Sequence, residues 1–132
     1  MNLESNYYDI AVENLKSANA IMKCADGDEA QFKRAGYFVQ QSVEVAIKYI
    51  LFQNGIDKIR TKTHDLAMLV KIAKEAGVDL FLNSFLKQYL YTITDWEEKS
   101  RYIIGYYAEQ QLVERAIKET YKYLETIRDK KI

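Results

Sequence analysis

The stretch AGYFVQQSVEVAIKYILFQNG, which covers residues 35–55, decides the fold. Its apolar side chains recur every three or four positions, the spacing that gives an α-helix one face for packing against a core. Asp28, with Gln31 three residues later, resembles a capping box at the start of this helix, and Asn54 with Gly55 ends it. The sequence therefore predicts one long helix, whose apolar stripe is Phe32, Ala35, Val39, Val43, Ala46, Ile47 and Ile50.

Gly36 lies inside this helical pattern. A glycine at such a position costs about 1 kcal/mol relative to alanine, so its presence needs a reason. Because a missing side chain lets two helices approach closely, we expect another helix to cross here.

Four further segments show helical periodicity. Thr63 and Asp79 are the expected N-caps of the third and fourth helices, because their short side chains accept hydrogen bonds from free helical N–H groups. Residues 56–62 are the expected connector, and residues 101–105 the expected break before the last helix. The five expected helices cover residues 3–24, 28–54, 63–77, 79–99 and 106–127. Short connections make neighbouring helices antiparallel, so the sequence predicts an all-α, up-and-down four-helix bundle with one additional short helix.

Composition limits the possible functions. The 132 residues form one expected domain, 1–132, which is long enough to bury a core without disulfides or metal. Nineteen basic residues balance nineteen acidic ones, so binding to nucleic acid or to an anionic membrane would need a local patch. The single Cys24 and the absence of a secretory signal or a long apolar run predict a cytoplasmic protein without a membrane partner.

The sequence also excludes several kinds of site. His64 is the one histidine of the chain, which excludes a metal site built from two histidines and reaction schemes that need two. Glycine-rich phosphate loops are missing, so the sequence predicts no metal and no cofactor. Glu97 and Glu98 are adjacent and point about 100° apart on a helix, so we expect both at a solvated helix end.

Two places carry side chains that could bind a ligand. His64 stands at an expected helix start, where it either fixes the loop or contacts a ligand or partner. The chain's one basic stretch surrounds it and consists of Lys58, Arg60, Lys62, Lys71 and Lys74. In the second place, Tyr102, Tyr106 and Tyr107 lie close to Arg101. Aromatic rings stack on bases and arginine binds phosphate, so this cluster indicates a nucleotide or RNA surface, a subunit interface or intrachain packing.

Three pieces of the chain together resemble the HEPN family (higher eukaryotes and prokaryotes nucleotide-binding). The first is the stretch of residues 35–55 quoted above, with its Gln-Gln pair at 40–41, Glu44 and Lys48. The second, THDLAMLVKIAKEAG at residues 63–77, is similar to the family's His-Asp-Leu helix start. The third, EKSRYIIGYY at residues 98–107, resembles its Arg-Tyr segment at Arg101 and Tyr102. The pieces occur in the family's order.

The resemblance implies an all-α bundle that usually forms a dimer. Members of the family are often ribonucleases, frequently toxins paired with a small nucleotidyltransferase antitoxin, and others are noncatalytic nucleotide- or RNA-binding modules. Their ribonuclease motif is an arginine followed, after four to six intervening residues, by histidine; counted from Arg101, these positions hold Tyr106, Tyr107 and Ala108. Tyrosine, with a pKa near 10, is a poor base at neutral pH, so the missing histidine favours binding without catalysis.

The leading hypothesis is a noncatalytic homodimer that binds a nucleotide or RNA, or docks on a nucleotidyltransferase. The residues expected to bind are Arg101, Tyr102, Tyr106, Glu44, Lys48, Gln41 and His64. Arg101 would contact phosphate, and Glu44 with Lys48, one helical turn apart, would orient Arg101 or close the dimer. Two alternatives stay open. One is a metal-independent ribonuclease in which Arg101 acts with Tyr106, Tyr107 or His64, and the other is a domain that only forms a homodimer.

Overall fold

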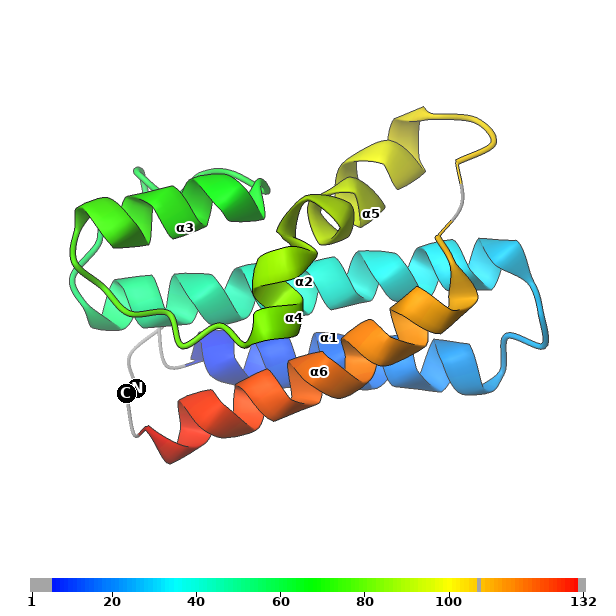
Figure 1. The fold of residues 1–132 in the computed structure, drawn as a ribbon, viewed down its shortest axis with the longest axis horizontal. Helices are drawn as coiled ribbons and strands as arrows, with labels where there is room; N and C mark the ends of the chain where they lie inside the picture. Colours follow the sequence, from blue (N-terminus) through cyan, green and yellow to red (C-terminus); the bar gives the residue numbers. More distant parts are fainter. Residues whose placement is uncertain (1–5, 107, 131–132) are drawn as a thin grey trace.

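The computed structural model describes residues 6–106 and 108–130, and for residues 101 and 102 the backbone alone. The described residues form six helices and no strand (Figure 1). These helices are α1 (Asn6–Lys23), α2 (Glu29–Gln53), α3 (Leu66–Glu75), α4 (Ser84–Gln88), α5 (Leu90–Tyr102) and α6 (Gln110–Asp129). The predicted all-α bundle is therefore confirmed, with one helix more than the five expected.

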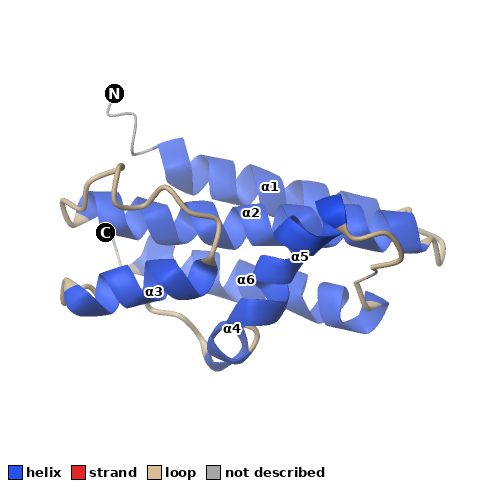
Figure 2. Cartoon of the chain, turned by 90° about the horizontal axis from the view of Figure 1, so that it is seen from above, coloured by secondary structure: helices blue, strands red, loops and turns tan. Residues whose placement is uncertain are grey.

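Helix α2 is the centre of the bundle. Asp28 caps its start by accepting a hydrogen bond from Ala30 N, as the sequence predicts. The helix packs against α1, α3, α5 and α6, and the predicted apolar stripe is buried along its whole length. α1 runs antiparallel to it on one side, while α3 and α5 lie along the other (Figures 1 and 2). Side chains on α2 therefore contact four of the other helices in the described part of the chain.

At Gly36 the side chain of Trp96 on α5 packs directly against α2. A Cβ atom added there would lie 3.1 Å from Cγ of Trp96, whose side chain is almost fully buried. Ordinary van der Waals contacts are longer, so a larger residue would push the two helices apart. The expectation that another helix crosses at Gly36 is confirmed.

The start of the third helix differs from the prediction by two residues. Asp65, rather than Thr63, is the N-cap, because its carboxylate accepts from Ala67 N. Thr63 instead accepts from Asp65 N through its hydroxyl oxygen, which shapes the turn that leads into the cap.

The expected fourth helix is two helices. Asp79 caps no helix, since its carboxylate accepts from Phe81 N in a local turn, and Asn83 caps α4 by accepting from Leu86 N. Tyr89 then adopts a non-helical backbone and separates α4 from α5. α4 packs against α6, whereas α5 packs against α2 and α3, so the chain must change direction at Tyr89 even though the apolar period continues through it. The last helix also begins at Gln110, later than the predicted residue 106.

Two buried hydroxyl groups form hydrogen bonds between distant parts of the chain. Ser42 Oγ on α2 donates to Ala11 O on α1 at 2.7 Å. Tyr123 OH on α6 donates to Leu80 O at 2.7 Å and is fully buried. Burial raises the pKa of the Tyr123 hydroxyl far above its usual value, and the Asp79 carboxylate adds to this shift. None of the helices in the described part of the chain is both long and apolar enough to cross a membrane.

The substitution Tyr123→Phe is expected to lower the free energy of unfolding by about 1–2 kcal/mol at pH 7, because the buried Leu80 carbonyl loses its donor. The folded chain holds the Tyr123 proton more tightly than the unfolded chain, whose tyrosines ionise near pH 10. The hydroxyl therefore stabilises the fold fully below that pH, and this contribution is lost as the pH rises above about 10. Urea unfolding at pH 7 and pH 11 measures both effects.

The matched control is Tyr91→Phe, since Tyr91 is 74% exposed. The control should match the wild type at both pH values, whereas Tyr123→Phe should lose less stability than the wild type between pH 7 and pH 11. Equal alkaline losses in all three proteins would contradict this assignment.

Candidate functional site

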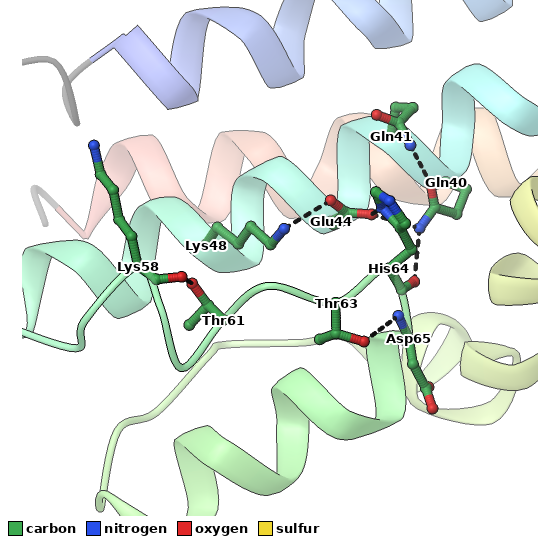
Figure 3. Close-up of polar contacts among 9 residues, drawn as sticks. All are labelled: Gln40, Gln41, Glu44, Lys48, Lys58, Thr61, Thr63, His64 and Asp65. Carbon is green, nitrogen blue, oxygen red and sulfur yellow. Dashed lines mark hydrogen bonds and ion pairs between the residues drawn. The ribbon is translucent and has the colours of Figure 1, made fainter.

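The carboxylate of Glu44 is the centre of a polar network on α2. Its side chain is 5% exposed, and three donors surround it (Figure 3). Oε1 accepts from Gln40 Nε2 and lies 2.9 Å from His64 Nδ1, while Oε2 accepts from Lys48 Nζ, also at 2.9 Å. Gln40 and Lys48 stand one helical turn before and after Glu44, so the helix itself supplies two of the three partners. The buried charge is thereby matched.

The network also holds the loop that leads into α3. Gln40 is fully buried, and its Nε2 atom donates to His64 O at 3.0 Å, while its Oε1 atom accepts from Gln41 Nε2 at 2.7 Å. Two residues beyond His64, Leu66 N donates to Thr94 Oγ1 on α5. The start of α3 is thus fastened to both α2 and α5.

His64 fixes this loop and also remains accessible. Because a carboxylate only accepts hydrogen bonds, Nδ1 must carry the proton that it shares with Glu44. The imidazole side chain is 62% exposed, so a ligand or partner could still reach it. Helix capping belongs to Asp65, so the loop-fixing role predicted for His64 rests on this contact and on its carbonyl oxygen.

The predicted Glu44–Lys48 pair is present in the structure as a 2.9 Å ion pair. Gln41 lies on the same turn of α2 and touches the network through Gln40. Glu44 binds three donors in the described part of the chain. The suggestion that it also orients Arg101 stays a prediction.

The Arg-Tyr segment forms the end of α5. Arg101 and Tyr102 are its last two residues, and Tyr107 lies outside the described residues. Tyr106 is half-buried in the loop that follows and packs against the core. Burial raises the pKa of the Tyr106 hydroxyl, and the Asp95 carboxylate raises it further. Tyr106 therefore stays protonated at neutral pH and is suited to donate a hydrogen bond rather than to accept a proton.

A hollow of about 430 Å³ opens beside the end of α5. Ser100, directly before Arg101, forms one wall, and its buried Oγ has no hydrogen-bond partner among the described residues. The other wall is the first half of α2, which contributes Ala30, Lys33, Arg34, Tyr37 and Phe38. The lining of the hollow therefore combines aromatic rings with two cations.

The hollow and the Glu44 network occupy different parts of α2. The last α2 residue in the hollow, Phe38, precedes Glu44 by six residues, which is about 9 Å along the helix axis. Glu44, Lys48, Gln41 and His64 form one group around the Glu44 carboxylate. The side chains of Arg101 and Tyr102 lie outside the described part of the chain, so their place in the site stays a prediction.

Sequence reasoning missed Glu97. It was expected at a solvated helix end, but it is 5% exposed, whereas its neighbour Glu98 is exposed. Glu97 follows the fully buried Ile93 by four residues, which places both on the core-facing side of α5. The same four-residue spacing puts Glu97 one helical turn before Arg101. This spacing was the sequence signal that could have identified Glu97 as a residue of the site. The residues that line the hollow carried no comparable signal, because tertiary packing alone brings Ser100 to α2.

The bundle, together with a polar network that ties its second helix to the His-Asp-Leu start of the third, defines a small all-α domain of the HEPN type. A family model for the HEPN domain matches residues 3–130, nearly the whole chain, so the chain belongs to this family. At the level of the family, this supports a nucleotide- or RNA-related module. Comparisons with curated proteins and with solved structures gave no match.

The substitution Glu44→Gln should lower the free energy of unfolding by about 1–3 kcal/mol, because the amide nitrogen would face donors from Gln40, His64 or Lys48. Urea unfolding at pH 7 measures the change. Glu13→Gln is the matched control, since Glu13 forms a 3.6 Å ion pair with Lys16 at the surface. The control should change stability by less than about 0.5 kcal/mol. A loss at Glu44 no larger than this would show that the network contributes little.

Proposed function

We propose that this chain is a noncatalytic HEPN module that binds a nucleotide or a single-stranded RNA segment at the hollow beside the end of α5, and that it acts as a homodimer. The observation that carries the proposal is the combination of Tyr37, Phe38, Arg34 and Ser100 around one opening, next to Arg101. The aromatic rings suit a base, and the cations suit phosphate.

The aromatic part of the hollow suits a base. The rings of Tyr37 and Phe38 lie 5.5 Å apart in an edge-to-face arrangement. Stacking of a base on an aromatic ring contributes about 1–3 kcal/mol and tolerates any sequence, because every base has a π-face.

The cations of the hollow suit phosphate. Arg34 donates to Gln31 Oε1 through one guanidinium nitrogen, which leaves further N–H groups for a ligand, and Lys33 is its neighbour. Arg101 follows Ser100 at the end of α5. A chain with no net charge can thus attract a phosphate backbone locally.

Several observations favour binding over cleavage. A general base for RNA cleavage should titrate near neutral pH, and the motif positions after Arg101 hold Tyr106, Tyr107 and Ala108. The pKa of Tyr106 is raised rather than lowered. The ring of His64 is held by Glu44, further along α2 than the hollow.

A subunit or protein contact at the same end of the molecule is part of the proposal. Ile103 and Ile104 follow α5 and are both exposed, Ile104 fully. Two adjacent exposed isoleucines beside an aromatic hollow are typical of interface residues. A second copy of the chain, or a small nucleotidyltransferase, would cover them.

Arg34→Ala and Arg101→Ala should each weaken RNA binding about tenfold, because each removes a charged donor to phosphate that contributes roughly 1.5 kcal/mol. Fluorescence anisotropy with an end-labelled, mixed-sequence RNA in the presence of EDTA measures the dissociation constant. Lys118→Ala is the control, since Lys118 is an exposed cation on α6, and it should change the constant less than twofold. Equal effects of all three substitutions would overturn the assignment.

The same samples, run on a denaturing gel, test the noncatalytic part of the proposal. The RNA should remain intact with every variant. Cleavage by the wild type that disappears in Arg101→Ala would establish the ribonuclease alternative instead.

A further inference from the structure

A second pocket lies at the opposite end of α2 from the hollow. Its volume is about 290 Å³, which is at the small end of ligand pockets. The second half of α2, the start of α1 and the loop after α2 form its walls. Three of its lining residues are lysines, Lys48, Lys58 and Lys62, and one is an acid, Glu44. We call this site the lysine pocket.

The lysine pocket carries an excess of positive charge. Its lining residues bring three ammonium groups against one carboxylate, and that carboxylate already binds Lys48, Gln40 and His64. Lys48 uses one of its three N–H donors on Glu44, and no other acceptor for it occurs among the described residues. Lys62 has no ion-pair partner in the described part of the chain. Uncompensated cations around a concave site attract and concentrate anions.

Lys58 is held in place before any ligand arrives. The buried hydroxyl of Thr61 donates to Lys58 O at 3.0 Å, and Thr61 N donates to the same oxygen (Figure 3). The ammonium of Lys58 lies 5.7 Å from the ring centroid of Phe52 and 5.8 Å from that of Tyr7. The two rings pack edge to face at 5.1 Å and form the wall on which the ammonium rests. Such preorganisation reduces the cost of binding.

We propose that the lysine pocket binds a small polyanion of the phosphate class, a phosphate or diphosphate group. Lysines bind phosphate as point charges and need no planar partner, and the pocket is lined by three lysines and no arginine. The net excess of two positive charges matches the charge of a phosphate group near neutral pH. The site is separate from the hollow and does not depend on the function proposed for it.

Isothermal titration calorimetry of the full chain with pyrophosphate, at constant ionic strength, tests the proposal. Lys58→Ala/Lys62→Ala should weaken pyrophosphate binding at least tenfold. Lys23→Ala/Lys118→Ala removes the same charge from exposed positions and should change it less than twofold. Circular dichroism verifies that both double variants keep their helices. Absence of binding to the wild type, or equal weakening in both double variants, would overturn the proposal.

Three further arms define the ligand and separate the two sites. Arg34→Ala should leave unchanged the part of pyrophosphate binding that Lys58→Ala/Lys62→Ala removes, even where it weakens RNA binding, so failure of one site does not imply failure of the other. ADP binding that is weakened by Lys58→Ala/Lys62→Ala supports a diphosphate carried on a nucleotide, and binding of pyrophosphate alone supports the free anion. Succinate that binds as tightly as pyrophosphate would overturn the phosphate class.

Discussion

The hydrogen bonds and the ion pair of the buried Glu44 carboxylate are the interactions on which the placement of α3 depends. A carboxylate that is removed from water must be matched by donors, and here Gln40 and Lys48 come from the same helix while His64 comes from 20 residues further along the chain. That third donor determines where the loop after α2 must pass. The cap of α3 and its hydrogen bond to Thr94 follow directly, so one buried charge positions α2, α3 and α5 together.

The length of α2 separates the hollow near its start from the lysine pocket near its end. Near its start, Tyr37, Phe38 and Arg34 face Ser100 of α5 and offer stacking surface with charge. Near its end, lysines of α2 and of the following loop surround a smaller pocket without arginine. The Glu44 network lies between them and lines the second of the two. A rigid central helix can thus present two ligand sites that need not compete.

The sequence was sufficient to predict the all-α fold and the buried stripe of α2. Period and caps predicted α2 and the one-turn spacing of Glu44 and Lys48, because these depend on residues near one another in the chain. A glycine inside a helical pattern predicted that another helix crosses at Gly36, although it could not identify Trp96 as the contact. Periodicity could not predict the bend at Tyr89, since the apolar period runs through it while α4 and α5 pack against different helices. Nor could it place Ser100 beside Tyr37 or bury Glu97, because both depend on how α5 lies across α2. Local patterns therefore identified the framework, whereas the contacts between distant helices needed the structure.

Photocrosslinking tests the central claim most directly, namely that RNA is bound at the hollow beside α5. Single-stranded RNA that contains 4-thiouridine is irradiated with the wild-type chain, and the crosslinked peptides are identified by mass spectrometry. We predict crosslinks within residues 30–38 and around residues 100–106, where aromatic side chains can stack on the modified base. Crosslinks confined to the loop of residues 54–65, or their absence with RNA at saturating concentration, would contradict the account.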